Sequence, residues 1–454
     1  MTRFEFFFDA ALLPDGWARD VEVAVVDGMI HAVVPGAAAG GRPRIAGAVL
    51  PGLPNLHSHA FQRAIAGSTE RRGPANDSFW TWREAMYRFV DQLGPDDIEA
   101  ISAMAMMEML EGGFTSVAEF HYLHHDRHGQ PYADKAELST RIVAAAAQTG
   151  IGLTLLPVLY AQGGFGGLPT ETRQRRFINR IDDYLVLHEK ARDAVARLPH
   201  GAIGAAPHSL RAVTPETLRA LLDADVGGPV HIHIAEQIQE VEACIAWSGR
   251  RPVEWLLSNA PVDTNWCLVH ATHLTPSEIA ALAALGAVAG LCPTTEANLG
   301  DGLFEGAAFL AAGGRYGVGS DSNVEISAAQ ELRWFEYGQR LKDRSRNVAT
   351  AREGQSTGEA LYRAAASGGA QALAQPVGEI ACGKRADFVV LDTSHPSLAA
   401  MEPAQWLDGY VFVAGQSAVT QVYVAGVRVV EGGRHVRRDA IASRFVSTMK
   451  RILK

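Results

Sequence analysis

Cysteine is scarce in this sequence, and the few that are present lie far apart. Four occur in 454 residues, at Cys244, Cys267, Cys292 and Cys382, and no two form a C-x-x-C pair. So few scattered cysteines do not provide a disulfide framework for a chain of this length, and we expect free thiols in a reducing compartment, the cytoplasm. Cys292 is expected to pack in the core, as buried free cysteines usually do.

Long apolar runs and clusters of basic charge are also missing. The longest uncharged stretch, residues 142–170, is interrupted by Gln148 and Pro157, so it lacks the ~18 consecutive apolar residues of a membrane-spanning helix. The first ten residues contain Glu5 and Asp9 and lack the basic flank and apolar core of a signal peptide. Lysine and arginine number 41 against 50 acidic residues and form no run. This balance argues against nucleic acid or an anionic membrane as a partner.

The chain divides into three blocks according to its strand and turn pattern. Residues 21–26 and 30–34 are strand candidates joined by a turn at Asp27-Gly28. Valine-rich strand candidates return near the other end, at residues 388–391, 421–424 and 427–430. Because both ends are rich in strands and the middle is not, we predict one small β-sandwich domain built from residues 1–49 and 380–454. A larger domain would occupy residues 50–379.

The middle block alternates strand-like and helical segments. Stretches rich in Ala, Leu and Glu, such as residues 96–110 and 215–222, have helical spacing. The strand candidates between them are residues 49–59, 115–122, 152–160, 202–208, 230–235, 267–270, 287–292 and 316–321. Eight parallel strands close a barrel, so we predict the α/β class and a (β/α)8 TIM-like barrel. A doubly wound open sheet is the alternative, but no G-x-G-x-x-G follows the first strand and there is no P-loop.

Histidines and one aspartate occur where several of these strands end. They are His57 and His59 at the first strand, His231 and His233 at the fifth, His270 at the sixth and Asp321 at the eighth. Side chains at positions i and i+2 of a strand share a face, and the C-terminal strand ends of a barrel form its active site. Three imidazoles and a carboxylate suit zinc or another borderline divalent ion. Spacing alone does not decide between His231 and His233.

The segment Pro51–His59, together with the histidines and aspartate at the later strand ends, resembles the amidohydrolase superfamily. Residues 378–391 resemble its closing β segment, so the resemblance covers essentially the whole chain. Binuclear members bridge two ions with a modified lysine at the end of the fourth strand, and neither residues 151–160 nor 202–208 contain lysine. The resemblance therefore implies one divalent metal ion per chain, Zn²⁺. Its implied ligands are His57, His59, His233 and Asp321, with a structural role for His231.

The same resemblance implies hydrolysis of a carbon–nitrogen bond with release of ammonia. Glu236, three residues after His233, would carry a proton between the attacking water and the leaving nitrogen. His270 would orient that water, and Asp321 would accept a proton from it in addition to ligating the metal. The alternative interpretation of Glu236 is an exposed glutamate at the start of a helix. The resemblance also implies a homodimer.

Further segments resemble those members of the superfamily that deiminate a small linear amidine carrying two carboxylates. These segments are residues 55–64, 77–84, 119–122, 207–213 and 292–302. Two carboxylates need fixed cations, and arginine forms bidentate pairs with them. Arg211, just after the fourth strand, and Arg83, in the loop after the first, are the candidates, and Gln62, Tyr122 and His208 could complete the hydrogen bonds.

Several alternatives remain open at this point. Arg83 could be a charge on a helix surface, and Tyr122 a core aromatic. The chain could instead deaminate a purine, pterin or triazine ring, which would need a flatter aromatic pocket and less arginine. A metal-free scaffold is a third hypothesis, but it predicts lost ligands or a lost Glu236. A cluster of histidines after the second strand is interpreted as a polar loop: His121, His124, His125 and His128.

Overall fold

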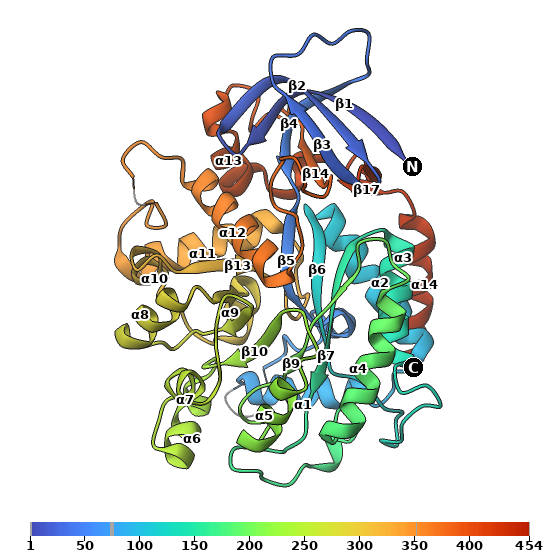
Figure 1. Ribbon diagram of the computed structural model, residues 1–454, viewed down its shortest axis with the longest axis vertical. Helices are drawn as coiled ribbons and strands as arrows, with labels where there is room; N and C mark the ends of the chain where they lie inside the picture. Colours follow the sequence, from blue (N-terminus) through green and yellow to red (C-terminus); the bar gives the residue numbers. More distant parts are fainter. Residues whose placement is uncertain (1, 73–76, 351, 454) are drawn as a thin grey trace.

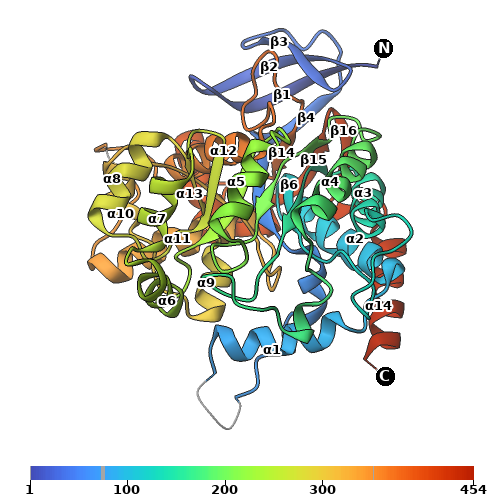
Figure 2. The same cartoon turned by 60° about the horizontal axis from the view of Figure 1, so that its bottom comes forward.

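The computed structural model describes residues 2–72, 77–350 and 352–453; residues 1, 73–76, 351 and 454, which fall inside the predicted domains, lie outside this description. Strands from both ends of the chain form a sheet at one end of a barrel built from the middle of the chain (Figure 1). Helix α1 (Phe79–Val90) lies at the opposite end of the barrel (Figure 2). The terminal sheet therefore covers one end of the barrel, and α1 lies at the other.

Eight parallel segments form the barrel, in agreement with the predicted fold class. They are β5 (Leu53–Ser58), β6 (Phe114–His121), β7 (Gly152–Leu159), the broken strand β8 (Ala202–Ile203) and β9 (Ala206–Pro207), β10 (Val230–Ile234), β11 (Trp266–His270), β12 (Val288–Leu291) and β13 (Arg315–Val318). They pair as two parallel arcs, β5 to β9 and β10 to β13. Parallel bridges Ser58–Asp321 and Ala205–Val230 join the arcs, so the ring closes.

Closure of the barrel also brings the predicted ligands together through their backbones. The N–H of Asp321 donates to the carbonyl of His57 at 3.0 Å, and the N–H of His59 donates to the carbonyl of Asp321 at 2.9 Å. On the other side, the N–H of His233 donates to the carbonyl of His208 at 3.1 Å. These bonds hold the strand ends in register at the C-terminal rim, where a barrel enzyme places its chemistry.

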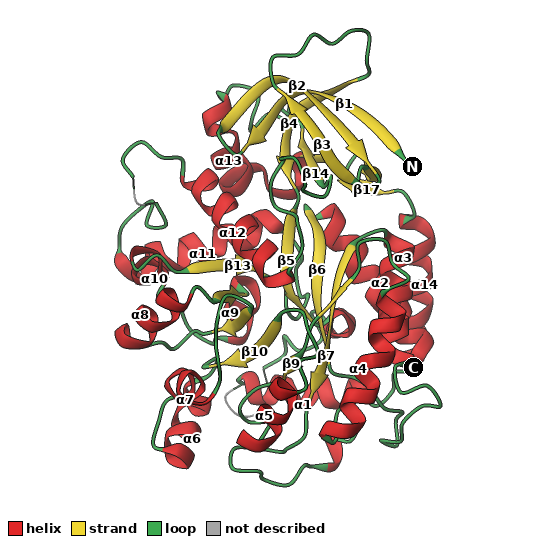
Figure 3. Ribbon diagram, in the orientation of Figure 1, coloured by secondary structure: helices red, strands yellow, loops and turns green. Residues whose placement is uncertain are grey.

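Helices cover the outside of the barrel (Figure 3). After α1 they are α2 (Pro95–Glu111), α3 (Glu137–Thr149), α4 (Ile181–Val195), α5 (Pro215–Asp223), α6 (Ile238–Ser248), α7 (Pro252–Asn259), α8 (Pro276–Leu285), α9 (Pro293–Leu299), α10 (Gly306–Ala311), α11 (Ala328–Asp343), α12 (Thr357–Leu373), α13 (Trp406–Gly409) and α14 (Arg438–Ile452). Helix α8 shows how the sequence sets their limits: the Thr275 side chain accepts from the N–H of Glu278, and Gly286 ends the helix at φ 68°.

The two ends of the chain form one mixed sheet. Its strands are β1 (Arg3–Leu13), β2 (Gly16–Val26), β3 (Met29–Val34), β4 (Arg44–Pro51), β14 (Phe388–Leu391), β15 (Val419–Val424), β16 (Val427–Glu431) and β17 (Arg434–His435), in the order β17-β16-β15-β14-β4-β1-β2-β3. The sheet has an apolar core of its own. Within this core, the ring of Phe6 on β1 contacts the rings of Phe388 on β14 and Tyr423 on β15.

Two strand predictions are wrong in their extent: residues 202–208 form the two short pieces β8 and β9, and residues 49–59 are divided as well. The segment 49–59 is not a single strand: β4 ends at Pro51 and pairs with β14, whereas β5 starts at Leu53 and pairs with β6. Gly52 separates them, and a Cβ at Gly52 would lie 2.1 Å from Oγ1 of Thr115. The chain passes from the terminal sheet into the barrel at this close approach. Within the described residues, no helix is both long and apolar enough to cross a membrane.

Candidate metal centre and active site

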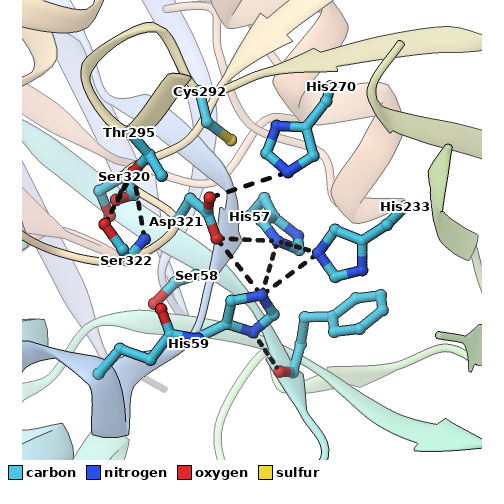
Figure 4. Close-up of polar contacts among 12 residues, drawn as sticks. His57, Ser58, His59, His233, His270, Cys292, Thr295, Ser320, Asp321 and Ser322 are labelled. Atoms are coloured by element: carbon cyan, nitrogen blue, oxygen red, sulfur yellow. Dashed lines mark hydrogen bonds and ion pairs between the residues drawn. The ribbon is translucent and has the colours of Figure 1, made fainter. Parts of the chain in front are cut away.

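Four side chains converge at the C-terminal rim of the barrel (Figure 4). They are the predicted ligands His57, His59, His233 and Asp321, all of them buried. The Nε2 atoms of the three imidazoles lie 3.1 to 3.3 Å from one another. Oδ1 of Asp321 lies 3.4 Å from Nε2 of His57 and 3.3 Å from Nε2 of His59. Three strands, β5, β10 and β13, supply these groups.

The donor set fits a divalent cation. Nδ1 of His59 donates to the carbonyl of Phe120 at 2.9 Å, and Nδ1 of His233 donates to that of His208 at 3.0 Å. With Nδ1 acting as donor, each Nε2 presents a lone pair to the centre of the cluster. Burial lowers the pKa of all three imidazoles, that of His57 to about 3, so they are neutral. Neutral lone pairs facing each other this closely need a cation between them.

The separations also agree with the size of a zinc site. For donor atoms about 2.0–2.1 Å from zinc, the edges of a tetrahedron are about 3.3 Å long. The three separations among the imidazoles and the two from Asp321 to His57 and His59 fall between 3.1 and 3.4 Å. The residues present therefore fit one small divalent ion.

Glu236 and His270 lie beside this cluster. Glu236 follows β10 by two residues and is buried, so the interpretation as an exposed helix-starting glutamate is wrong. Burial raises its pKa to about 7, although the nearby His270 and Arg211 oppose that shift. Nε2 of His270 lies 3.8 Å from Oε1 of Glu236 and 3.8 Å from Oδ2 of Asp321. A carboxyl group that titrates near neutral pH suits proton transfer.

Glu296 is a site residue that sequence reasoning missed. Its Oε1 lies 3.2 Å from Nδ1 of His270 and accepts the backbone N–H of Cys292 at 2.8 Å. Burial opposes a charge on His270, but Glu236, Glu296 and Asp321 raise its pKa to about 10. Glu296 thus fixes the ring of His270 with Nε2 turned towards Glu236 and Asp321. In the sequence, it lies within residues 292–302, one of the segments that carry the family resemblance, but nothing in its spacing singles it out.

A cavity opens beside the ligands. All five predicted substrate-binding residues line it: Gln62, Arg83, Tyr122, His208 and Arg211. Helix α1 contributes the residues Phe79, Trp82, Arg83, Met86 and Tyr87, whose spacing of three and four places them on one helical face. Arg83 therefore lies on a helix rather than in a loop, and its side chain lines the cavity.

The guanidinium groups of the two arginines in the cavity make cation–π contacts with an aromatic ring. The guanidinium of Arg211 lies 5.9 Å from the ring centre of Trp80, and that of Arg83 lies 4.5 Å from the same ring centre. Nη2 of Arg211 is 3.8 Å from Oε2 of Glu236. Within the described part of the chain, the buried Nε atom of neither arginine has a hydrogen-bond partner. Two cations with donors to spare face one small cavity, which suits a ligand carrying carboxylates.

Gln62, Tyr122 and His208 complete one wall. Nε2 of Gln62 donates to the hydroxyl of Tyr122 at 2.8 Å, and Oε1 of Gln62 is buried without a hydrogen-bond partner in the described residues. Nδ1 of His208 lies 3.1 Å from the hydroxyl of Ser209. Tyr122 packs at right angles against His59 and His208, so it is a buried aromatic that also borders the cavity.

Other histidines lie outside the cluster. Nε2 of His231 bonds to the carbonyl of Ala372 at 2.7 Å, so this side chain ties β10 to α12.

The interpretation of the His121–His128 segment as a polar loop is wrong for three of its four histidines. His121 ends β6 and is buried, and the buried rings of His124 and His125 bond to the carbonyls of Val158 and Ile178. The rings of His124 and His125 serve packing, because a backbone carbonyl from a distant segment bonds to one nitrogen of each ring.

Cys292 has a place at the edge of the metal cluster. It is fully buried at the start of α9, as expected for a packing residue. Its sulfur, a carboxylate oxygen of Asp321 and a ring nitrogen of His270 all lie within 4.8 Å of one another (Figure 4). Burial raises the pKa of the thiol well above its usual range, so the sulfur stays protonated.

Comparison with known protein families decides the family. Residues 48–429 match the amidohydrolase family. The chain belongs to the amidohydrolase family. A second match covers residues 6–45 and is described as the N-terminal domain of formimidoylglutamate deiminase HutF. The amidohydrolase match spans the barrel and most of the closing strands, and the second match spans the strands that precede them.

Individual relatives agree with this family. Formimidoylglutamate deiminase of Pseudomonas aeruginosa is 54% identical over 98% of this chain and 99% of its own length. The crystal structure of an amidohydrolase from Brucella melitensis has 48% identity and a TM-score of 0.95, covering 99% of this chain and all of its own. A 5-methylthioadenosine/S-adenosylhomocysteine deaminase of Natronomonas pharaonis is 26% identical over 86% of this chain and 82% of its own length. The predicted barrel with a terminal β domain is thus confirmed as a fold class.

Proposed function

We propose that this chain is a formimidoylglutamate deiminase. It would hydrolyse N-formimino-L-glutamate to N-formyl-L-glutamate and ammonia, with one divalent ion, Zn²⁺, held by His57, His59, His233 and Asp321. One observation carries the proposal: one cavity is lined by the ligands His59, His233 and Asp321 and by Arg83 and Arg211, two arginines whose buried Nε atoms have no hydrogen-bond partner among the described residues. The 54% identity to the deiminase of Pseudomonas aeruginosa over nearly the whole chain supports it.

Substrate binding follows from the cavity walls. The substrate carries two carboxylates, and Arg211 and Arg83 would each bind one through charged hydrogen bonds. Gln62, Tyr122 and His208 would hold the remaining polar atoms. The formimino group then lies towards Glu236 and His270, whose Oε1 and Nε2 atoms are 3.8 Å apart.

Proton transfer is assigned to the residues beside the ligands. A divalent ion held by His57, His59, His233 and Asp321 would supply Lewis acidity and would lower the pKa of a water molecule to about 7. Glu236 accepts the proton of that water as its oxygen attacks the formimino carbon, and Asp321 and His270 hold the water in place. Glu236 then donates this proton to the imino nitrogen. Asp321 accepts the second proton of the attacking water, which also passes to that nitrogen as the carbonyl forms, so the carbon–nitrogen bond breaks and ammonia leaves. Water adds and ammonia departs, so atoms and charge balance.

A panel of substrates tests this function directly. Ammonia release would be measured with N-formimino-L-glutamate, with N-formimino-glycine, which lacks the side-chain carboxylate, and with adenosine and S-adenosylhomocysteine. We expect N-formimino-L-glutamate to be preferred over N-formimino-glycine by at least ~10-fold in kcat/KM, because one missing charged contact costs about 1.5–3 kcal/mol. Faster turnover of a ring substrate would contradict the proposal and favour the ring deaminase.

Replacement of Arg211 by methionine is expected to weaken recognition of the dicarboxylate. Loss of a charged hydrogen-bond partner should lower kcat/KM for N-formimino-L-glutamate by ~30-fold to ~1000-fold, or about 2–4 kcal/mol. Arg211→Lys should recover only part of this loss, because an ammonium lacks the planar fork of guanidinium. Steady-state kinetics of the three proteins would provide the measurement.

Two controls separate this effect from general damage. Arg219→Met removes an exposed arginine of α5 and should leave kcat/KM unchanged. Two substrate analogues, one with the side-chain carboxylate and one with the α-carboxylate replaced by an amide, should identify the carboxylate that Arg211 binds. For the analogue that lacks this carboxylate, kcat/KM of Arg211→Met should be close to that of the wild type. Normal turnover of N-formimino-L-glutamate by Arg211→Met would remove Arg211 from the site.

The cellular setting is part of the proposal. All four cysteines are free in the structure, and Cys244, Cys267 and Cys292 are buried. Free thiols are typical of proteins in a reducing compartment, and we propose the cytoplasm. The homodimer implied by the family stays a prediction, which analytical ultracentrifugation would check.

A further inference from the structure

The chain makes a strained turn between the metal ligand His233 and the proton carrier Glu236. Strand β10 ends at Ile234, and α6 begins at Ile238. Between them, Ala235 has a φ of 50°, in the left-handed region that a residue with a Cβ disfavours. Such a conformation persists only where the surrounding structure holds it. The residue that holds this turn also determines where the side chain of Glu236 lies.

The carboxylate of Glu240 makes two hydrogen bonds to this turn. Its Oε1 accepts the N–H of Ala235 at 3.2 Å, and its Oε2 accepts the N–H of Glu236 at 3.1 Å. Glu240 is almost completely buried, so water does not compete readily for either bond. The carbonyl of Ala235 accepts the N–H of His273 at 3.1 Å. The peptide group between Ala235 and Glu236 is therefore held at both its N–H and its C=O.

These contacts differ from those of a helix cap. Glu240 is the third residue of α6, and Gln237 is its N-cap. In a capping box, a glutamate at this position bonds the N–H of the N-cap residue itself. Glu240 instead reaches the amides one and two residues before the N-cap, outside the helix. Its carboxylate thus stabilises the turn that carries Glu236 rather than the first turn of α6.

We propose that Glu240 is a positioning residue for the reaction: its carboxylate holds the left-handed turn at Ala235 and thereby directs the Glu236 carboxyl group towards His270 and Arg211. Glu236 lies 3.8 Å from each of those residues, and a shift of its backbone would change both distances. This inference rests on the proposed role of Glu236 as proton carrier. Small displacements of catalytic groups lower the rate constant of the chemical step more than substrate binding.

The first test is Glu240→Gln. The amide keeps one acceptor oxygen but turns an NH2 group towards the second backbone N–H, so one hydrogen bond is lost. We expect kcat to fall by ~10-fold to ~100-fold with KM within ~3-fold of wild type, because a misplacement of about 1 Å costs up to ~100-fold in rate. Bound metal should stay at the wild-type level. Glu242→Gln, an exposed position two residues further along α6, is the matched control and should leave kcat unchanged.

A rescue experiment separates positioning from general stability. Glycine adopts a φ of 50° without the penalty of a Cβ. Ala235→Gly alone should have nearly wild-type kcat, and in the Glu240→Gln background it should recover kcat at least ~3-fold. A purely structural role would instead lower the melting temperature with kcat unchanged, and a role through charge on Arg211 would lower KM with kcat unchanged, because the guanidinium would bind a substrate carboxylate more tightly. Either of these outcomes would overturn the proposal.

Amide hydrogen exchange gives a measurement that needs no substrate. The amides of Ala235 and Glu236 should exchange at least ~100-fold more slowly than unprotected amides in the wild-type protein. In Glu240→Gln, their exchange should be at least ~10-fold faster, while the amides of β10 keep their rates. Fast exchange in the wild type would contradict the proposal even if the variant fails to fold. If the wild type releases no ammonia from N-formimino-L-glutamate, the proposed function fails. The exchange rates would still test whether Glu240 holds the turn at Ala235.

Discussion

Replacement of Asp321 by alanine is expected to abolish ammonia release and to remove the metal. Oδ1 of Asp321 lies 3.3–3.4 Å from the Nε2 atoms of His57 and His59, and it is the only carboxylate oxygen in the four-ligand group found among the described residues. Without it, three neutral imidazoles remain, and the site loses both a ligand and the negative charge that offsets the cation. Elemental analysis should find one ion per wild-type chain and almost none in the variant.

The expected loss has two controls. His57→Ala should give the same result, because the ligands act together, whereas Asp343→Ala at the exposed end of α11 should change neither metal content nor rate. Circular dichroism should show that both inactive variants keep the barrel, whose strands are joined by backbone bonds that remain in place. Two tightly held ions per active wild-type chain would refute the single-metal proposal. So would a fully active Asp321→Ala protein without metal.

The convergence of the candidate ligands could be predicted from the sequence because a parallel barrel gathers its strand ends, although the choice of His233 over His231 comes from the family resemblance. His57, His233 and Asp321 are separated by up to 264 residues, yet each stands at or just after the end of a strand. In a closed parallel barrel all these ends meet at one rim, so the fold alone brings the side chains together. The period of two along a strand also predicts that His57 and His59 face the same way.

The contacts around the ligands could not be predicted in this way. Glu296 reaches His270 because α9 turns back over the rim, and no spacing rule connects a residue of that helix to a strand end 26 positions earlier. The histidines after β6 suggest a polar loop by composition, but the carbonyls of Val158 and Ile178 allow His124 and His125 to be buried. Arg83 lies on a helix whose limits the sequence indicates only weakly. Each of these features depends on tertiary packing rather than on local pattern.

Replacement of Glu236 by glutamine is expected to lower kcat by at least ~100-fold, the effect of removing a general acid–base group. The amide has the same shape, so bound metal and substrate affinity should stay close to wild type. Burial raises the pKa of Glu236 to about 7. Below this pH the carboxyl group already carries a proton and cannot accept another from water. The wild-type rate should therefore fall as the pH drops below about 7, and the variant should lack this dependence.

Comparing the changes in kcat and KM decides whether Glu236 transfers the proton or only balances the charge of Arg211. If it mainly balanced the charge of Arg211, 3.8 Å away, glutamine would leave that cation unpaired and tighten binding of a substrate carboxylate, so KM would fall together with kcat. If it moves the proton, KM stays and only kcat falls, because water can still bind but its proton has no acceptor. Near-normal kcat with an unchanged pH profile would assign proton transfer to another group, and His270, which is 3.8 Å from both Glu236 and Asp321, would be the next residue to replace.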